Sequence, residues 1–265
     1  MQKQQKMQLS VLISFVLFLS ACSLSSGDDE EITTRKVAEP TGMKADYEKA
    51  YQNYLNLGAQ YYASGNYEMA EARLMRAIEI NAERPEAWHG LANVYEAQQN
   101  IAAGEQVYEK LINAHPTYQQ GYFDYAKFLC KFNRNPERKK LYETMRAKGP
   151  EFSNMAAVAE GNCEKERGNA AGARTAYQQS LNLNDKSPDA LLALAQISVE
   201  QGNYGEALSH IQTLHTYQAV TPETLKLGIL AARGLNDAAA EQNFIRIMRS
   251  QKRFSNSPQA KELGL

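Results

Sequence analysis

Side chains suited to catalysis or metal binding are sparse in this sequence. The two closest histidines, His210 and His215, are five residues apart, a spacing that does not place both imidazoles on one face of a helix. The sequence contains no HExxH metal motif, glycine-rich phosphate loop or GxSxG nucleophile elbow. Glutamates such as Glu105 and Glu109 are typical of the solvated face of an amphipathic helix. We therefore predict no catalytic residue, no metal and no cofactor held by side chains, although a site assembled from distant residues stays open.

Composition narrows the classes of partner. The 265 residues include 29 Lys and Arg against 30 Asp and Glu, and the formal net charge is -1. A nearly neutral chain has no field that would attract nucleic acid. The three cysteines are too few for a zinc cluster of the CxxC…CxxC type. We expect neither nucleic acid nor a small-molecule substrate as a partner.

The first 21 residues are typical of a cleaved signal peptide. Lys3 and Lys6 form a charged start, residues 9–19 form an apolar run, and small residues precede Cys22. The run has roughly eleven residues, whereas a helix needs about 20 to span a bilayer, so a retained transmembrane anchor is the weaker alternative. Residues 22–46 are rich in Ser, Gly, Asp, Glu and Thr, and we expect a flexible tether because they cannot bury enough apolar surface.

Residues 19–22, Leu-Ser-Ala-Cys, resemble the lipobox of bacterial lipoproteins. In that class the cysteine is acylated and becomes the mature N-terminus, so the resemblance implies a covalent lipid on Cys22. An Asp directly after the cysteine favours the inner membrane in that class, and Ser23 stands there instead. The resemblance implies a lipid anchor at the periplasmic face of the outer membrane. An ordinary signal peptide that ends near a cysteine is the alternative.

One phrase recurs along the chain with a period of 34 residues. Tyr54, Trp88 and Tyr122 occupy the same place in successive copies, as do Pro116 and Pro150. The phrase resembles the tetratricopeptide repeat (TPR), which implies an all-α, right-handed superhelical solenoid of about six helical hairpins over residues 47–265. A closed helical bundle is the rival, but a bundle requires no such period. We place the repeats at 51–84, 85–118, 119–153, 154–187, 188–221 and 222–255.

The repeated positions have a packing logic. Large residues recur where they would fill the space between helices, and Gly or Ala recurs where two helices would approach to about 8 to 10 Å. Three residues depart from this pattern: Arg138 stands at a small position, and Glu160 and Glu164 stand at apolar ones. These departures leave the packing of the third and fourth repeats in doubt.

The TPR resemblance also implies a binding surface. In such repeats, set positions of each first helix line a concave groove that grips extended or helical peptides. Packing of these side chains against the neighbouring repeat is the alternative. The predicted partner-binding residues are Leu55, Tyr62, His89, Asn93, Phe123, Lys127, Val158, Asn162 and Leu192.

Cys130 and Cys163 are predicted to form a disulfide. If Cys22 carries a lipid, they are the two cysteines left in an oxidising compartment. They lie 33 residues apart, almost one repeat, on equivalent first helices, so their Cα atoms can approach the roughly 4.4 to 6.8 Å that a bridge requires. Two buried free thiols that fill a gap between helices are the alternative.

A closer resemblance rests on the lipobox, the tether, six repeats, residues 125–130 (YAKFLC) and residues 161–163 (Gly-Asn-Cys). Together they resemble the type IV pilus biogenesis and stability lipoproteins. Membership of that family implies a pilotin, which helps the secretin of the pilus pore to reach the outer membrane and multimerise. The alternatives are another periplasmic TPR adaptor, for a cell-wall peptidase or for outer-membrane protein assembly, and a cell-wall enzyme.

Overall fold

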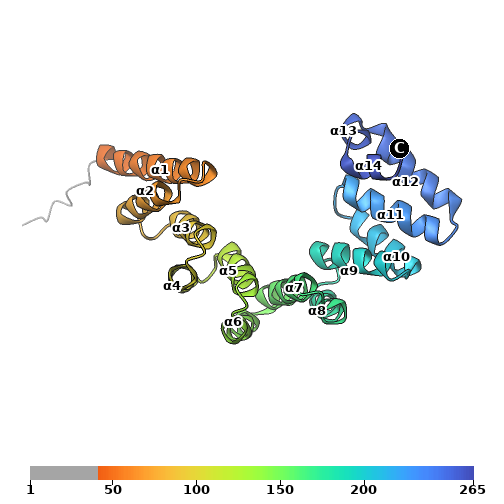
Figure 1. The fold of residues 1–265 in the computed structure, drawn as a ribbon, viewed down its shortest axis with the longest axis horizontal. Helices are drawn as coiled ribbons and strands as arrows, with labels where there is room; N and C mark the ends of the chain where they lie inside the picture. Colours follow the sequence, from red (N-terminus) through yellow and green to blue (C-terminus); the bar gives the residue numbers. More distant parts are fainter. Residues whose placement is uncertain (1–40) are drawn as a thin grey trace, which may run out of the picture. The chain divides into compact units, whose positions relative to one another are not determined.

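The protein's structure is a computed structural model that describes the backbone of residues 41–265 and the side chains of residues 46–265. The predicted signal peptide, Cys22 and most of the predicted tether lie outside the described residues. Gly42–Leu265 form one compact unit (Figure 1). The helices are α1 (Thr41–Ala63), α2 (Tyr67–Ile80), α3 (Pro85–Ala97), α4 (Ile101–Ala114), α5 (Gln119–Lys131), α6 (Asn135–Ala147), α7 (Pro150–Glu166), α8 (Ala170–Leu183), α9 (Pro188–Glu200), α10 (Tyr204–His215), α11 (Pro222–Gly234), α12 (Ala238–Ser250), α13 (Lys252–Ser255) and α14 (Pro258–Glu262).

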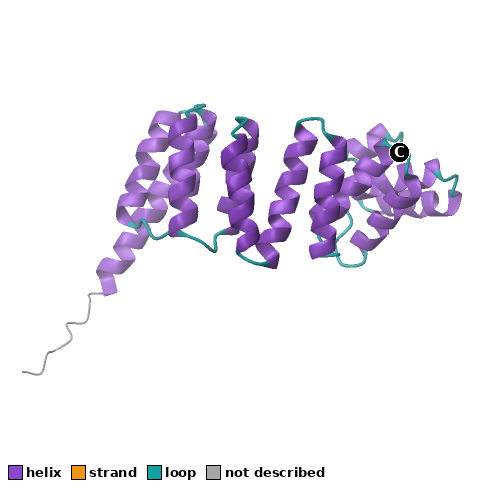
Figure 2. Cartoon of the chain, turned by 90° about the horizontal axis from the view of Figure 1, so that it is seen from below, coloured by secondary structure: helices purple, strands orange, loops and turns teal. Residues whose placement is uncertain are grey.

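The first twelve helices pair into six hairpins, which confirms the predicted all-α array. Each helix packs mainly on its neighbours in sequence, and α7 also contacts α5, the first helix of the preceding hairpin. Figure 2 shows the helices side by side in a row, without a strand in the described part of the chain. Within this unit, α3, α5 and α7 lie on the inner side of the curve and α4, α6 and α8 on the outer side (Figure 1). None of the described helices is both long and apolar enough to cross a membrane.

A left-handed residue ends the first helix of every hairpin. Three of the six positions are glycines, which adopt positive φ without steric cost, and the others are Asn or Gln. The Asn or Asp that follows often caps the second helix, as where Asn66 Oδ1 accepts a hydrogen bond from the backbone N–H of Met69 at 3.2 Å. The six left-handed residues are Gly65, Gln99, Asn133, Gly168, Gly202 and Asn236.

Glycines lie where the two helices of a hairpin cross most closely. A Cβ atom on Gly161 of α7 would lie 2.6 Å from Cε1 of Tyr177 on α8. A Cβ on Gly58 would lie 2.6 Å from Cγ of Leu74. The predicted small residues therefore permit the crossing, and the large residue of the partner helix fills the space over each glycine.

The core runs along the array rather than through a single centre. An N-terminal cluster extends from α2 to α7, and within it the rings of Tyr108 and Tyr125 stack with centroids 5.2 Å apart. A C-terminal cluster includes Phe254 of α13 and Ala260 of α14, both buried. α13 lies at the end of the predicted last repeat (222–255), whereas α14 lies beyond it and packs on α11, so the two short helices cover the end of the array.

Two predicted boundaries need correction. α7 begins at Pro150, four residues before the predicted fourth repeat, because Gly149 is left-handed (φ 120) and Pro150 suits the first turn of a helix. α1 begins at Thr41, inside the predicted tether, because residues 41–50 contain no proline and continue into the helix that buries Tyr51.

Candidate protein-binding groove

The first hairpins form a hollow on the inner side. It has a volume of about 260 Å³ and lies between α1 and α3. Tyr62 is 41% exposed at its edge, while Leu55 also packs against the N-terminal core. The structure therefore brings together the four groove residues predicted in the first two repeats. The hollow is lined by Leu55, Gly58, Ala59, Tyr62, Leu74, Glu86, His89, Gly90 and Asn93.

His89 is held by Tyr118, which directly precedes α5, and by Asp124 of α5. Its Nδ1 lies 3.0 Å from the Tyr118 hydroxyl, and its Nε2 lies 2.7 Å from Oδ2 of Asp124. Burial raises the pKa of Asp124, but hydrogen bonds from His89 and Gln120 outweigh it and hold that pKa below its usual value. The repeat pattern predicts that His89 contacts a partner protein, whereas in the structure both ring nitrogens contact side chains at the N-cap and in the second turn of α5.

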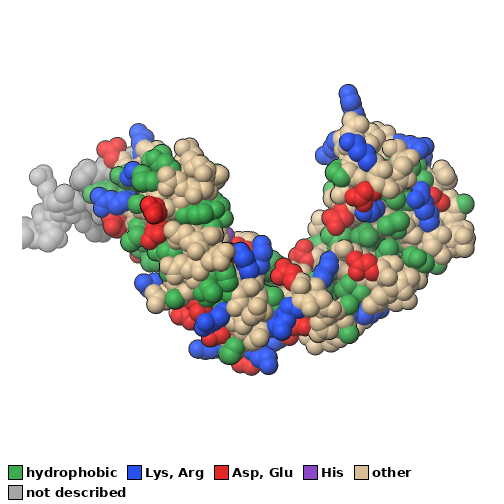
Figure 3. All heavy atoms as spheres, in the orientation of Figure 1, with side chains coloured by type: hydrophobic (Ala, Val, Ile, Leu, Met, Phe, Trp, Pro, Cys, Tyr) green, Lys and Arg blue, Asp and Glu red, His purple; other side chains and the backbone are tan. Residues whose placement is uncertain are grey.

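Two larger hollows lie between α5 and α7. One, of about 490 Å³, is formed by the later turns of these helices and includes Phe123, Lys127 and Asn162. The other, of about 430 Å³, is formed by their first turns and includes Phe123 and Val158. Phe123 lines both, so its half-buried ring divides them. Figure 3 shows acidic, basic and apolar side chains interspersed over the face in view, in keeping with the small net charge.

Not every predicted groove residue is free to contact a partner protein. Val158 is 2% exposed, so it serves the packing of α7 although its position borders a hollow. Leu192 packs against the C-terminal core cluster. Asn162 lines a hollow, but its Oδ1 accepts a hydrogen bond from the Tyr177 hydroxyl at 2.7 Å. Some of the predicted groove residues therefore pack within the array, as the alternative held. Partner binding by those that remain exposed stays a prediction.

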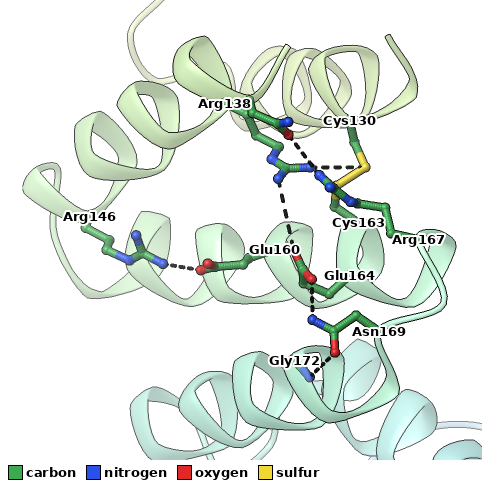
Figure 4. A network of polar contacts seen from close by, with 10 residues as sticks. Cys130, Arg138, Arg146, Glu160, Cys163, Glu164, Arg167, Asn169 and Gly172 are labelled. Carbon is green, nitrogen blue, oxygen red and sulfur yellow. Dashed lines mark hydrogen bonds and ion pairs between the residues drawn. A yellow bond between two sulfur atoms is a disulfide. The ribbon is translucent and has the colours of Figure 1, made fainter. Parts of the chain in front are cut away.

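A disulfide links α5 to α7 beneath the larger hollow. Cys130 and Cys163 are bonded, with their Cα atoms 5.7 Å apart. Arg138 of α6, only 6% exposed, points its guanidinium at both sulfur atoms (Figure 4). Its Nη2 lies 3.9 Å from Oε1 of Glu164, a partly buried carboxylate that compensates the buried cation.

The remaining departures from the repeat pattern belong to the same polar network. Glu160 forms an ion pair with Arg146 of the preceding hairpin. Glu164 accepts a hydrogen bond from Asn169 Nδ2 at 2.7 Å, and Asn169 in turn caps α8 through the N–H of Gly172 (Figure 4). Polar contacts thus replace apolar ones between the third and fourth repeats, which resolves the doubt about their packing.

Sequence reasoning missed the acidic residues of the α5–α7 hollows. Glu151 and Asp189 line the smaller one, and Glu166 lines the larger. Glu151 and Asp189 each follow a proline that opens a helix, a signal that places them in a first turn but not beside a hollow. Among the residues that the structure describes, no three His, Cys, Asp or Glu side chains cluster as a metal site.

Family models of the tetratricopeptide repeat match three segments, one described as TPR repeat (58–99) and two as Tetratricopeptide repeat (85–128 and 165–223). The chain therefore contains tetratricopeptide repeats, which form the hairpins described above.

The resemblance to the pilus family is confirmed by named relatives. The sequence is 24% identical to the type IV pilus assembly protein PilF of Pseudomonas aeruginosa, over 83% of each chain. The solved structure of P. aeruginosa PilF aligns with 83% of this chain and 98% of its own, at 21% identity and a TM-score of 0.52. The crystal structure of PilW, a widely conserved type IV pilus biogenesis factor, aligns with 81% of this chain and 98% of its own, at 20% identity and a TM-score of 0.55. The two structures establish the shared fold.

Proposed function

We propose that this protein is an outer-membrane lipoprotein of the pilotin type, which helps the type IV pilus secretin to reach the membrane and multimerise. The observation that carries the proposal is the similarity to a type IV pilus assembly protein, which extends over 83% of both chains rather than over one repeat. A similarity confined to the repeat motif would not require the two chains to match over most of their lengths. The protein acts as a scaffold and not as an enzyme, and the lipid on Cys22 is its only prosthetic group.

The inner surface of the hairpins supports a scaffolding role. Three hollows follow one another along the first helices, and Tyr62, Phe123 and Lys127 offer aromatic and cationic contacts there. Side chains of this kind bind peptide segments through apolar anchors and charge pairs. A segment of the secretin is the occupant that the proposal assigns to this surface.

The lipid anchor determines where the scaffold works. A lipoprotein cysteine carries several acyl chains, which suffice for stable membrane attachment. Residues 23–40, most of the predicted tether, connect Cys22 to α1. The body of the protein is therefore held close to the periplasmic face of the outer membrane, where a secretin would assemble.

A deletion strain complemented with variants tests this proposal. Loss of the protein is expected to abolish twitching motility and reduce secretin multimers in the outer membrane. Cys22→Ala is expected to reproduce the deletion and to leave the outer-membrane fraction, whereas Ser23→Ala, which keeps the cysteine, restores both readouts. Normal multimers and motility in the deletion strain would refute the pilotin assignment.

A further inference from the structure

The two hollows between α5 and α7 adjoin at Phe123, which lines both, and together they are called here the α5–α7 trench. Early residues of α5 share one hollow with early residues of α7, and late residues share the other, so the two helices run in the same direction. The trench is lined by Gln119, Gln120, Phe123, Lys127 and Cys130 of α5, by Glu151, Asn154, Met155, Val158, Ala159, Asn162, Cys163, Lys165 and Glu166 of α7, and by Asn184 and Asp189 near the start of α9.

The trench has opposite charges at its two ends. Glu151 and Asp189 lie at the end formed by the helix N-termini, and neither carboxylate has a basic partner within 4 Å among the described residues. Lys127 and Lys165 lie at the other end together with Glu166, which leaves that end with one net positive charge. Phe123 lies between the two ends and provides apolar surface.

Parallel packing of the helices explains this polarity. Acidic residues stabilise the first turn of a helix and basic residues the last turn, and Glu151, Asp189 and Lys165 occupy such positions. Because the first helices of successive hairpins point the same way, these charges accumulate at opposite ends of the trench.

The two lysines at the basic end of the trench, Lys127 and Lys165, are not neutralised by an ion pair among the described residues. Lys131, one turn beyond Lys127, is neutralised by Glu96, whose Oε1 lies 2.9 Å from its Nζ. Lys165 donates a hydrogen bond to Gln196 Oε1 at 2.6 Å, and because this amide is neutral it orients the ammonium without cancelling its charge. Lys127 is exposed and forms no ion pair within the described part of the chain.

We propose that the α5–α7 trench binds an extended peptide segment of a protein partner in one orientation. An acidic side chain of the segment contacts Lys127 and Lys165, an apolar side chain packs on Phe123, and a basic side chain contacts Glu151 and Asp189. This inference rests on the proposed scaffolding function and specifies the chemistry of the partner. Twelve residues of helix span about 18 Å, which accommodates about five extended residues.

The disulfide makes the trench a preformed site. Cys130 and Cys163 join its two walls, and both cysteines line it. Because the walls cannot separate without breaking the bond, binding requires little ordering of the protein. The segment that binds bears the ordering cost, and the charges at both ends select its direction.

Selection from a random 12-residue peptide display library on the immobilised full chain tests the proposal. Selected peptides are expected to carry an acidic and a basic residue in a fixed order, separated by an apolar residue. Lys127→Glu combined with Lys165→Glu is expected to weaken binding of these peptides by about tenfold at low salt, because two partly exposed attractions become repulsions. Lys139→Glu combined with Lys140→Glu, which reverses two exposed lysines on α6 outside the trench, provides the matched control.

Charge reversal at both ends gives the sharpest outcome. A variant that combines Lys127→Glu and Lys165→Glu with Glu151→Lys and Asp189→Lys is expected to select peptides with the opposite charge order. Selected peptides without a charge order, an unchanged order in this variant, equal weakening by the control pair, or a failure to select any peptide would each overturn the trench proposal. Normal secretin multimers in a deletion strain would instead overturn the pilus role and leave the trench in place, so the two failures are distinguishable.

Discussion

Gly161 is the position at which the packing of a hairpin can be tested with one methyl group. The Cβ atom of Gly161→Ala would lie 2.6, 2.7 and 2.8 Å from three ring carbons of Tyr177. That ring is fully buried, and its hydroxyl donates a hydrogen bond to Asn162 Oδ1 at 2.7 Å. The ring therefore cannot move aside without losing packing, the hydrogen bond or both.

Opposing effects set the size of the change. Overpacking of a rigid core costs about 1 to 3 kcal/mol. Replacing a helical Gly with Ala returns about 1 kcal/mol through helix propensity. The difference is a loss of up to about 2 kcal/mol, and we expect Gly161→Ala to lower the free energy of unfolding by about 1 kcal/mol, the middle of that range. Gly205→Ala is the matched control, because Gly205 lies in the first turn of α10 with nothing within 4 Å of a Cβ atom and is expected to gain up to about 0.5 to 1 kcal/mol.

Urea unfolding followed by far-UV circular dichroism measures both variants against the parent chain. A TPR array can unfold in parts, so amide hydrogen exchange in α7 and α8 should accompany the melts. The expected result is a lower midpoint and faster exchange in α7 and α8 for Gly161→Ala only. If Gly161→Ala were as stable as Gly205→Ala, the close approach of α7 and α8 would not be rigid and the packing argument would fail.

Three further outcomes are expected. Cys130→Ala combined with Cys163→Ala should lower the free energy of unfolding by about 3 to 4 kcal/mol, because the disulfide closes a loop of 33 residues. Two alkylatable thiols in the native protein would contradict the disulfide. Tyr62→Glu should change the free energy of unfolding by less than about 0.5 kcal/mol because that side chain is exposed. Phe123→Glu should lower the free energy of unfolding because its ring is half-buried against the core. Equal melting curves for the two variants would contradict this difference. Burial lowers the pKa of His215 below 6.5, so the unfolded chain binds the proton more tightly and stability is complete above about pH 6.5 and falls as the pH drops below it. His215→Gln should remove that part of the pH dependence in urea melts at pH 5 to 8, and an unchanged profile would contradict it.

The hairpins were predictable because their packing repeats. Gly58 and Gly161 stand at equivalent places for the same steric reason, and the turn at Gly65 requires positive φ, so each constraint recurs in the sequence. The pairing of Cys130 with Cys163 followed from the same period, which places both on equivalent first helices.

The inner surface was less predictable because it depends on contacts that do not repeat. The position of His89 matches the groove pattern, yet Asp124, which holds its Nε2, belongs to the next hairpin, and Tyr118, which holds its Nδ1, lies at the junction with that hairpin. Val158 follows the same pattern but is enclosed by close packing around α7. Helices α13 and α14 have no counterpart in the hairpin pattern and follow only from the need to cover the last hairpin.

The sequence predicted only part of the binding groove, for a related reason. Exposure of a side chain such as Tyr62 depends on how far adjacent first helices splay, which one repeat does not encode. The charge order of the trench arises from Glu151, Asp189 and Lys165, each of which satisfies a local helix preference in its own repeat. Their joint effect appears only when the hairpins are stacked.

Site-specific photo-cross-linking in pilus-producing cells tests the central claim most directly. A photoreactive amino acid would replace Tyr62 or Lys127 on the inner surface, or Lys139 on α6 as an exposed control outside the hollows. The account predicts a cross-linked product that contains the secretin from Tyr62 or Lys127 and none from Lys139. A secretin product from Lys139 alone, or none from either inner position while multimers still depend on the protein, would contradict it.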